Sequence, residues 1–503
     1  MNINSEQMAS NGLLFISNAA KTYRLCLKSS RLVKNILYVK YVGAENNLSI
    51  INKQIVDVYS QTAIKAPNLD IRLMLKPMEG VQTINTNHVI DLILCDSSIV
   101  NEDLKKSVIN VKKGCQLQNI DGEENNGKAA EEDVKTYEYV ALGGTFDRLH
   151  NGHKILLSQA ALRSTKHVTV GVTDVNMIQS KLLWELIEPV EERVEAVKDF
   201  LTDVKPDLEY NVLPIQDLYG PTKDDPRFQM IVLSEETQKG GVKINEKRKE
   251  NGLQQLDMHI IALARDEEHS AEEEEKLSSS NTRMRLLGTL IRPPQPNPNI
   301  PDSPYVIGLT GGIASGKTNI TEKLKQKGAA VVNCDLIAHE LYKPDMPLNR
   351  TLAATFGNDI ITEAGEVDRR KLGQIVFSDK NQLDKLNKTV WPFIIEEARN
   401  RIKLLGEQGY KVVVMEAAVM VRAKWFLNCH QLWAVIVPPK EAIRRIQERN
   451  NLTEEEARQR VDAQPTNAEQ VAQANVVFSP YRSYEFTQQQ IDRAWAQLQR
   501  YLQ

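Results

Sequence analysis

Apolar residues along the chain follow two different spacings, which predicts strands and helices in turn. Continuous runs rich in β-branched and aromatic residues predict buried strands at 137–146, 168–174, 410–419 and 432–438. Between such runs, apolar residues recur every three to four positions, as at 150–164, which predicts amphipathic helices. Strands that alternate with helices favour parallel sheets. The pattern therefore predicts an α/β fold.

Two segments interrupt this pattern and divide the chain. Residues 121–133 combine many acidic residues with two glycines and no strong apolar residue, which predicts a flexible linker. Residues 292–303 are rich in proline, which disfavours a helix and predicts an extended, semi-rigid linker. We therefore expect three parts: a small α/β region of unknown role at 1–120, and larger parts at 134–291 and 304–503.

The beginning of the chain has an unusual charge pattern. Between Glu6 and Glu45 there is no acidic residue, while lysine and arginine recur. Such stretches are typical of mitochondrial targeting sequences, so we expect targeting or association with the mitochondrial membrane surface. The expected location is the cytoplasm, the mitochondrial matrix or the outer-membrane surface. The alternative is an ordinary first strand–helix unit, because residues 36–42 have the pattern of a strand.

Overall composition excludes several classes of protein. The 503 residues include 63 basic and 66 acidic ones, giving a net charge of −3. A nearly neutral chain is not a general binder of polyanions, which argues against nucleic acid and requires local phosphate sites. No apolar run approaches the ~18 residues of a membrane-spanning helix. Five widely spaced cysteines favour a reducing compartment over a disulfide framework.

The first motif with recognisable chemistry is GGTFDRLHNGH at 143–153. Gly143 and Gly144 would let a phosphate approach the backbone, and His150 and His153 share one face at the start of a helix. A helix N-terminus favours anions, and imidazoles there can donate hydrogen bonds to phosphate oxygens. A structural turn or an adventitious metal site is the alternative for so short a motif.

A second motif lies further along the same part of the chain. KLSSSNTRMRLLG at 276–288 places three serines and Arg283 at the start of a probable helix. Hydroxyl and N–H groups at such a position suit a triphosphate, and the arginine would neutralise its charge. Alone, the serines would more simply cap the helix.

Together these motifs resemble the phosphopantetheine adenylyltransferase family of the HxGH nucleotidyltransferase superfamily, over roughly 137–291. The resemblance implies transfer of AMP from ATP to 4′-phosphopantetheine, giving dephospho-CoA and pyrophosphate. It implies that His150 and His153 stabilise the reacting phosphate and that Lys181 contacts the phosphate of phosphopantetheine, although a solvated lysine is an equal alternative there. The residues implied to bind ATP are Gly144, Thr145, Phe146, Ser278, Ser279, Ser280 and Arg283.

The C-terminal part carries a phosphate-binding loop. YVIGLTGGIASGKT at 305–318 is an apolar strand followed by GxxxxGKT and a helix. In this pattern the backbone N–H groups cradle phosphates, Lys317 reaches the β- and γ-phosphates, and Thr318 binds Mg²⁺. The loop residues expected to bind ATP are Gly311, Gly312, Ile313, Ala314, Ser315, Gly316, Lys317 and Thr318.

Further polar residues follow at places that suit a kinase. Asp335 ends the predicted strand 329–335, where its carboxylate could accept a hydroxyl proton, or could simply cap the next helix. Arg444, Arg445 and Arg449 lie at helical spacings and could close over ATP as a lid, of which Arg445 is the expected ATP ligand; a solvated charged helix is the alternative.

TGGIASGKT, NCDLIAHELY, DRRKLGQIVF and LNKTVWPFI together resemble dephospho-CoA kinase over about 304–503. The resemblance implies phosphorylation of the 3′-hydroxyl of dephospho-CoA by ATP, with Asp335 as base or orienting group. Four residues differ from the simplest bacterial pattern and leave the acceptor site less certain: Trp391, Glu416, Asn475 and Ser479.

Because one predicted product is the other predicted substrate, the whole chain resembles the animal type of bifunctional coenzyme A synthase. This implies an enzyme that carries out the last two steps of coenzyme A synthesis with ATP and Mg²⁺. Three alternatives remain open. The first domain could act on another phosphorylated acceptor, one domain could be a nucleotide-responsive scaffold, and residues 1–120 could bind a membrane or a protein partner.

Overall fold

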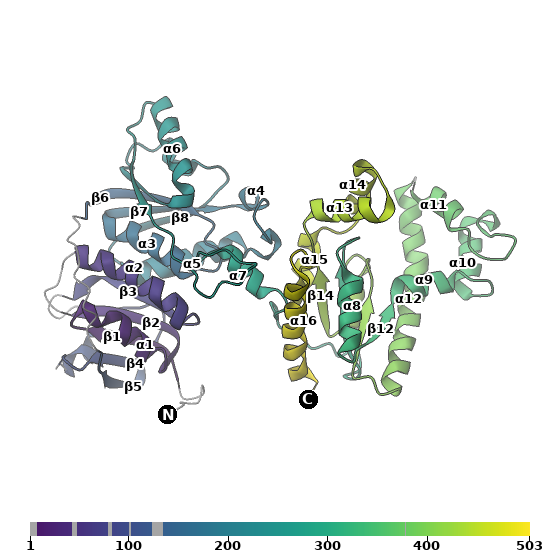
Figure 1. Cartoon of the computed structure of the whole chain (residues 1–503), viewed down its shortest axis with the longest axis horizontal. Helices are drawn as coiled ribbons and strands as arrows, with labels where there is room; N and C mark the ends of the chain where they lie inside the picture. Colours follow the sequence, from purple (N-terminus) through teal and green to yellow (C-terminus); the bar gives the residue numbers. More distant parts are fainter. Residues whose placement is uncertain are drawn as a thin grey trace. The chain divides into compact units, whose positions relative to one another are not determined.

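The computed structural model describes residues 8–42, 48–78, 83–99, 102–122, 134–377 and 379–502. The chain forms two compact units, Met1–Arg283 and Met284–Gln503 (Figure 1). The described residues build three five-stranded sheets whose neighbouring strands are all parallel, so the predicted α/β fold is confirmed. Two of these sheets lie in the first unit and one in the second.

The first sheet has the strand order β3-β2-β1-β4-β5. Its strands are β1 Ala9–Ile16, β2 Val33–Val42, β3 Asp70–Met78, β4 Ile90–Asp96 and β5 Val111–Ile120, with helices α1 Thr22–Ser29 and α2 Leu48–Lys65. The stretch without acidic residues therefore folds as a strand, a helix and a strand, the alternative considered above. Whether it also directs the protein to mitochondria stays a prediction.

The second sheet has the order β10-β9-β6-β7-β8. Its strands are β6 Tyr137–Gly144, β7 Ser164–Thr173, β8 Glu209–Ile215, β9 Met230–Ser234 and β10 Asp257–Ile261, with helices α3 Asn151–Arg163, α4 Val175–Ile178, α5 Val190–Val204, α6 Gln238–Glu250 and α7 Ser279–Leu286. Numbered from their own first strand, both sheets have the order 3-2-1-4-5. The first unit thus repeats one topology, although its sequence shows no repeat of fixed period.

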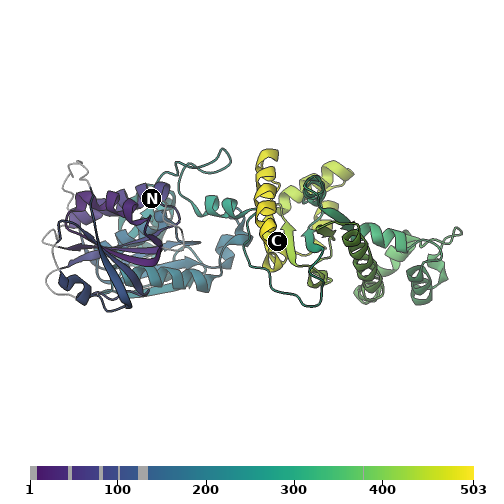
Figure 2. The ribbon, with the colours of Figure 1, turned by 90° about the horizontal axis from the view of Figure 1, so that it is seen from below.

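The two sheets of the first unit share one hydrophobic core. Helices α2, α3 and α5 lie between them (Figure 1), and Figure 2 shows the strands of this unit with helices on either side. The continuous cluster of buried side chains includes Leu14 of β1 and Ile55 of α2 as well as Leu157 of α3 and Val170 of β7. Residues before the predicted acidic linker therefore belong to the same folding unit as those after it. That linker lies mostly outside the described residues, and the predicted division into domains stays a prediction.

This shared core makes the N-terminal strands important for stability. We expect that deleting residues 1–40 unfolds the first unit, because β1 is the central strand and Leu13, Leu14, Phe15 and Ile16 are fully buried. Burial of four such side chains contributes about 6–12 kcal/mol, comparable to the whole stability of a typical domain. Calorimetry should show loss of one unfolding transition while the transition of the second unit remains. Two unchanged transitions would contradict a shared core.

The second unit is built on a sheet of order β12-β13-β11-β14-β15. Along the strand Val412–Glu416, Val412 and Val414 pack on one face of the sheet, whereas Val413 and Met415 pack on the other. This alternation buries both faces, which explains the continuous apolar runs in the sequence. The strands are β11 Tyr305–Gly311, β12 Ala330–Asn333, β13 Val412–Glu416, β14 Gln431–Val435 and β15 Val476–Phe478. The helices are α8 Lys317–Gln326, α9 Cys334–Leu341, α10 Pro347–Phe356, α11 Arg369–Phe377, α12 Lys380–Glu407, α13 Pro439–Asn450, α14 Glu454–Asp462, α15 Asn467–Gln473 and α16 Tyr484–Leu498.

The proline-rich segment 292–303 contains neither helix nor strand. It is not a free spacer, because it belongs to the second unit and is hydrogen-bonded to it. Asn475 Nδ2 donates to the Arg292 carbonyl at 3.1 Å, and Asn297 Nδ2 donates to the Leu427 carbonyl at 2.7 Å. Among the described residues, no helix is both long enough and apolar enough to cross a membrane.

Candidate active sites

The first candidate site is a cavity of about 650 Å³ in the first unit, at the carboxyl ends of β6, β9 and β10. Ligands of open parallel sheets usually bind at this edge. The cavity brings together all ten residues that the sequence suggested for the first reaction, although their roles stay predictions. These lining residues are Gly144, Thr145, Phe146, His150, His153, Lys181, Ser278, Ser279, Ser280 and Arg283.

His150 and His153 form a stacked pair at the start of α3. His150 is the N-cap residue, His153 lies in the first turn, and their ring centroids are 3.8 Å apart. Burial lowers the pKa of His153 to about 3, and it lowers the pKa of His150 well below its usual value, with further lowering by His153. Both imidazoles are therefore neutral at neutral pH, and each has one N–H group to donate.

Phe146 shapes the backbone beside the histidines. Its φ is +51°, its side chain is fully buried, and its ring centroid is 5.3 Å from that of His153. A Cβ atom at Gly144 would lie 3.1 Å from the Phe146 ring, closer than ordinary contacts. The glycine is therefore explained by the neighbouring ring, and the predicted approach of a phosphate to it remains untested.

The serine motif borders the same cavity from α7. Ser279 Oγ donates to the Asp147 carbonyl at 3.2 Å and lies 3.5 Å from His150 Nε2. Arg283 Nη1 donates to Asp147 Oδ2 at 2.6 Å, and both side chains are almost completely buried. This ion pair holds the arginine in place, and its suggested role in binding the triphosphate stays a prediction. Burial, with help from Arg283, lowers the pKa of Lys181, which lines the cavity with its own amine.

Two residues of this site were missed from the sequence. Asp147 lies within the quoted glycine–histidine motif, but only the fold brings Arg283 to it. Arg193 of α5 is 1% exposed and donates to the carbonyls of Thr145 and Thr173 at 2.7 and 2.9 Å. It therefore fixes the loop after β6. No spacing in the sequence distinguishes this arginine from others on a charged helix.

The second candidate site is the phosphate loop between β11 and α8. Lys317 Nζ donates to the carbonyls of Gly311 and Gly312 at 2.7 and 3.2 Å. Gly316 has a φ of +96°, which favours glycine, and a Cβ atom at Gly311 would lie only 2.6 Å from the Val435 carbonyl oxygen. The backbone of the loop is therefore tightly turned, as is needed for its N–H groups to point toward a bound phosphate.

Neighbouring side chains hold this loop in place. Arg445 Nη1 donates to the Ala314 carbonyl at 3.3 Å, and Gln464 Oε1 accepts from the Ile313 N–H at 2.6 Å. Of the three arginines considered as a lid, Arg445 therefore contacts the loop. Arg444 instead pairs with Glu441 on the surface of α13 at 2.8 Å, as expected for a solvated charged helix.

Asp335 and Glu416 supply carboxylates near the loop. The predicted strand that ends at Asp335 was too long, because β12 ends at Asn333. Asn333 caps α9 by accepting from the Leu336 N–H at 3.0 Å, so the reading of Asp335 as the cap is wrong. Burial raises the pKa of Asp335 and lowers that of Lys317. The opposite charges of the two side chains partly offset both shifts. Glu416 ends β13 and accepts from Thr321 Oγ1 at 3.1 Å.

The other unusual residues of this unit make structural contacts. Trp391 meets the edge of the Trp425 ring, with centroids 6.4 Å apart. Asn475 Oδ1 accepts from the Leu432 N–H at 2.7 Å, and the Ser479 N–H donates to Gln490 Oε1 at 2.9 Å. These three positions therefore give no reason to regard the site as inactive.

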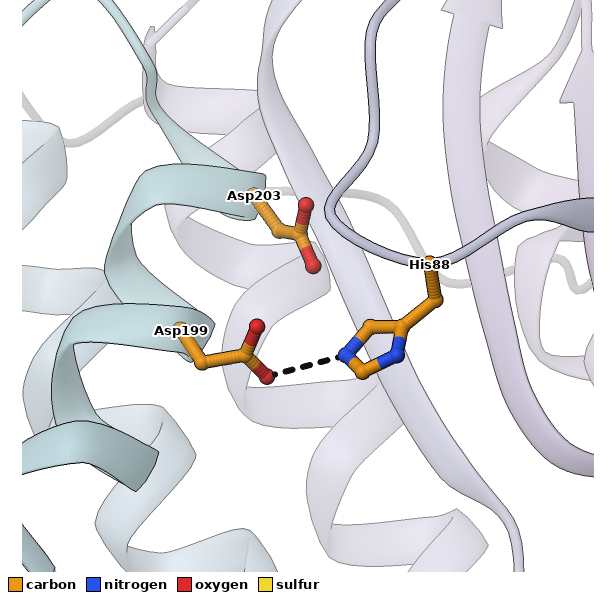
Figure 3. A group of neighbouring side chains, drawn as sticks. All are labelled: His88, Asp199 and Asp203. Atoms are coloured by element: carbon orange, nitrogen blue, oxygen red, sulfur yellow. Dashed lines mark hydrogen bonds and ion pairs between the residues drawn. The ribbon is translucent and has the colours of Figure 1, made fainter. Parts of the chain in front are cut away.

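One cluster of three potential metal ligands occurs in the described part of the chain: His88, Asp199 and Asp203 (Figure 3). His88 Nε2 lies 3.1 Å from Asp199 Oδ2. However, the guanidinium of Arg72 pairs with both carboxylates, at 2.8 Å for Asp199, and Tyr38 donates to Asp203 at 2.8 Å. A cation from the protein already pairs with both carboxylates of this cluster, so we interpret it as a contact between the first sheet and α5.

Comparisons with known proteins agree with the presence of a different candidate active site in each of the two units. The family model "Dephospho-CoA kinase" matches residues 305–483, and the model "Cytidylyltransferase-like" matches residues 141–285. The dephospho-CoA kinase of Carboxydothermus hydrogenoformans is 38% identical over 186 residues, which are 37% of this chain and 90% of that protein. Those of Syntrophus aciditrophicus and Shouchella clausii are both 35% identical, over 38% of this chain and 82% and 96% of their own lengths.

These relatives match the second unit, whose sheet order and phosphate loop fit a kinase. The first unit has the cytidylyltransferase-like match around its histidine pair. Both units therefore have enzymatic homologues, and ATP is the implied co-substrate. The chain belongs to the dephospho-CoA kinase family through its C-terminal unit, and the cytidylyltransferase-like domain that precedes the kinase gives it the architecture of a bifunctional coenzyme A synthase.

Proposed function

We propose that the first unit transfers AMP from ATP to 4′-phosphopantetheine, and that the second unit phosphorylates the ribose 3′-hydroxyl of the resulting dephospho-CoA. The observation that carries this proposal is the cavity in which His150, His153 and Ser279 meet, in a chain whose other unit belongs to the dephospho-CoA kinase family. A nucleotidyltransferase that produces dephospho-CoA would supply the substrate of the attached kinase.

In the proposed first reaction, the acceptor phosphate attacks the α-phosphate of ATP and pyrophosphate leaves. Charge builds on the α-phosphate oxygens, and the neutral N–H groups of His150 and His153 can donate to them. Ser278, Ser279 and Ser280 offer hydroxyl groups to the leaving phosphates, and Lys181 offers an amine to the acceptor phosphate. The enzyme forms no covalent intermediate in this scheme, so positioning and charge stabilisation provide the catalysis.

In the proposed second reaction, the loop holds the phosphates of ATP and Lys317 contacts its β- and γ-phosphates. The raised pKa of Asp335 suits a group that accepts the proton of the 3′-hydroxyl or orients that hydroxyl. Transfer of the γ-phosphoryl group then leaves ADP. Lys317 and Asp335 interact electrostatically, which is consistent with their acting on the same phosphate.

Oxygen-rich side chains beside the loop fit a magnesium ion. Thr318 offers a hydroxyl at the start of α8, and the carboxylates of Asp335 and Glu416 both influence the pKa of Lys317 and so lie near it. Mg²⁺ prefers such oxygen ligands. When bound, it would neutralise charge on the phosphates of ATP.

The proposal predicts defined products from the purified chain. With 4′-phosphopantetheine, ATP and Mg²⁺, we expect pyrophosphate, dephospho-CoA, ADP and finally CoA, identified by mass spectrometry. Because the matching family model is named for cytidylyl transfer, CTP should be offered in a parallel reaction. Preference for CTP, or no product from phosphopantetheine while added dephospho-CoA is phosphorylated, would contradict the first half of the proposal.

A further inference from the structure

The start of α3 has two faces that contact different parts of the first unit. His150 and His153 face the cavity, whereas Asn151 and Lys154 contact residues before the acidic linker. Asn151 Nδ2 donates to the Tyr59 carbonyl at 2.8 Å and to Thr62 Oγ1 at 3.4 Å. Lys154 Nζ pairs with Asp70 at 2.7 Å. The residues that alternate with the two histidines are therefore held by α2 and β3 of the first sheet.

These contacts are largely buried and meet at Tyr59, whose carbonyl accepts from Asn151 and whose ring centroid lies 6.0 Å from Lys154 Nζ. Lys154 is 5% exposed, and Tyr59 and Thr62 are fully or almost fully buried. Burial tends to raise the pKa of Asp70, but Lys154 and Arg72 outweigh it and lower the pKa. Asp70 is thus ionised, and the buried ammonium of Lys154 has its counter-ion. A largely buried ion pair of this kind restricts the groups within it to few arrangements.

The histidine rings have little else to orient them. The Nδ1 atoms of both rings are buried and have no hydrogen-bond partner. A histidine that acts in catalysis is usually oriented by a carboxylate or a carbonyl at its second nitrogen. Here the rings depend on their mutual stacking, on Phe146, on the long contact of His150 Nε2 with Ser279 Oγ at 3.5 Å, and on the backbone of α3. Anything that fixes the start of this helix therefore fixes the direction of both N–H groups.

We propose that Asp70, with the Tyr59 carbonyl and Thr62, positions the histidine pair of the nucleotidyltransferase by holding Lys154 and Asn151. The region before the acidic linker thereby acquires a role in the first reaction. Asp70 and Lys154 act through the helix and are positioning residues. The proposal rests on the function proposed above, and it concerns how that site is held in place.

The test compares three variants of the full chain with a matched control. Asp70→Asn and Lys154→Met remove the buried ion pair from opposite sides, and Asn151→Ala removes the neighbouring hydrogen bond with less effect on folding. Asp199→Asn is the control, because it breaks an ion pair of Arg72 between the same two sheets but at α5, away from the histidines. Asp199 and Asp70 have similar exposure, 25% and 31%.

We expect the kcat of adenylyl transfer to fall about 10–100-fold in Asp70→Asn and Lys154→Met, since small misplacements of reacting groups have effects of this size. The KM for ATP should stay within about threefold, because the serines on α7 are untouched. The double variant Asp70→Asn/Lys154→Met should have a kcat no lower than that of either single variant, since both substitutions break the same ion pair. In Asp199→Asn, kcat should remain within about twofold.

Hydrogen exchange provides a readout that needs no substrate. Amides of residues 150–155 should exchange faster in all three variants but not in Asp199→Asn. This measurement decides the proposal even if the parent chain adenylates no phosphopantetheine, an outcome that would contradict only the proposed function. Unchanged exchange at 150–155 in folded Asn151→Ala and Lys154→Met, or equal losses of kcat in Asp70→Asn and Asp199→Asn, would overturn the positioning role.

Discussion

A chain carrying Lys317→Met should convert 4′-phosphopantetheine and ATP to dephospho-CoA and pyrophosphate, and should stop there. Lys317 is the cation of the phosphate loop, and its amine reaches the carbonyls of Gly311 and Gly312 at the place where the phosphates of ATP are expected. Methionine keeps most of the length of the side chain and removes the charge. Loss of a cation that stabilises phosphoryl transfer lowers kcat about 10³–10⁵-fold. Mass spectrometry of the products measures the effect directly.

The control is the same substitution at Lys327, the residue that directly follows α8. Lys327 caps the end of that helix and pairs with Asp492 at 2.6 Å, so Lys327→Met should still make CoA at nearly the parental rate. Asp335→Asn should also stop at dephospho-CoA, because ATP can bind but the acceptor hydroxyl loses its base or orienting group. Formation of CoA at the parental rate by Lys317→Met would refute the kinase site.

The second large effect concerns the histidine pair. His153→Ala should lower the kcat of adenylyl transfer about 10²–10³-fold, the usual cost of one donor that acts on developing charge. The variant should still phosphorylate added dephospho-CoA, because the kinase lies in the other unit. Release of pyrophosphate with phosphopantetheine as acceptor is the measurement.

Two further variants of the same unit sharpen this result. His153→Gln keeps a neutral N–H donor and should recover part of the lost rate. His167→Ala removes a histidine from β7 that lies 3.1 Å from Thr169 Oγ1, outside the cavity lining, and should have little effect. If His153→Ala keeps adenylyl transfer within about threefold of the parent, the assigned role is wrong.

The sequence predicted those parts of the fold that are specified locally. The phosphate loop needs glycines at fixed places because its own backbone turns there, as the φ of Gly316 shows. By contrast, β1 lies within the basic stretch without acidic residues, and neither β1 nor β5 was predicted. In β5 only Cys115 and Ile120 are buried, because it is an edge strand defined by its pairing with β4. Neither apolar spacing nor composition reports such pairing.

In the first candidate site, too, the sequence predicted the motifs but not the contacts between distant residues. All ten suggested residues of the first site line one cavity; nine of them belong to two compact motifs, and Lys181 lies in neither. The partners that decide their charge and position are remote in sequence. Asp147 pairs with Arg283, and Asp70 pairs with Lys154, although each pair is far apart in the sequence and is brought together only by folding. A single sequence contains both members of each pair but nothing that links them.

The single core shared by the two sheets of the first unit has a genetic consequence. A substitution at Leu14 or Ile55, far from any motif, would damage the first enzymatic step and leave the kinase working. Such an allele should be complemented in trans by a separate adenylyltransferase gene and not by a separate dephospho-CoA kinase gene. Alleles that harm the first step would therefore extend through the core to the first strand, β1. Alleles of the two activities would form two complementation groups, with the division near residue 283.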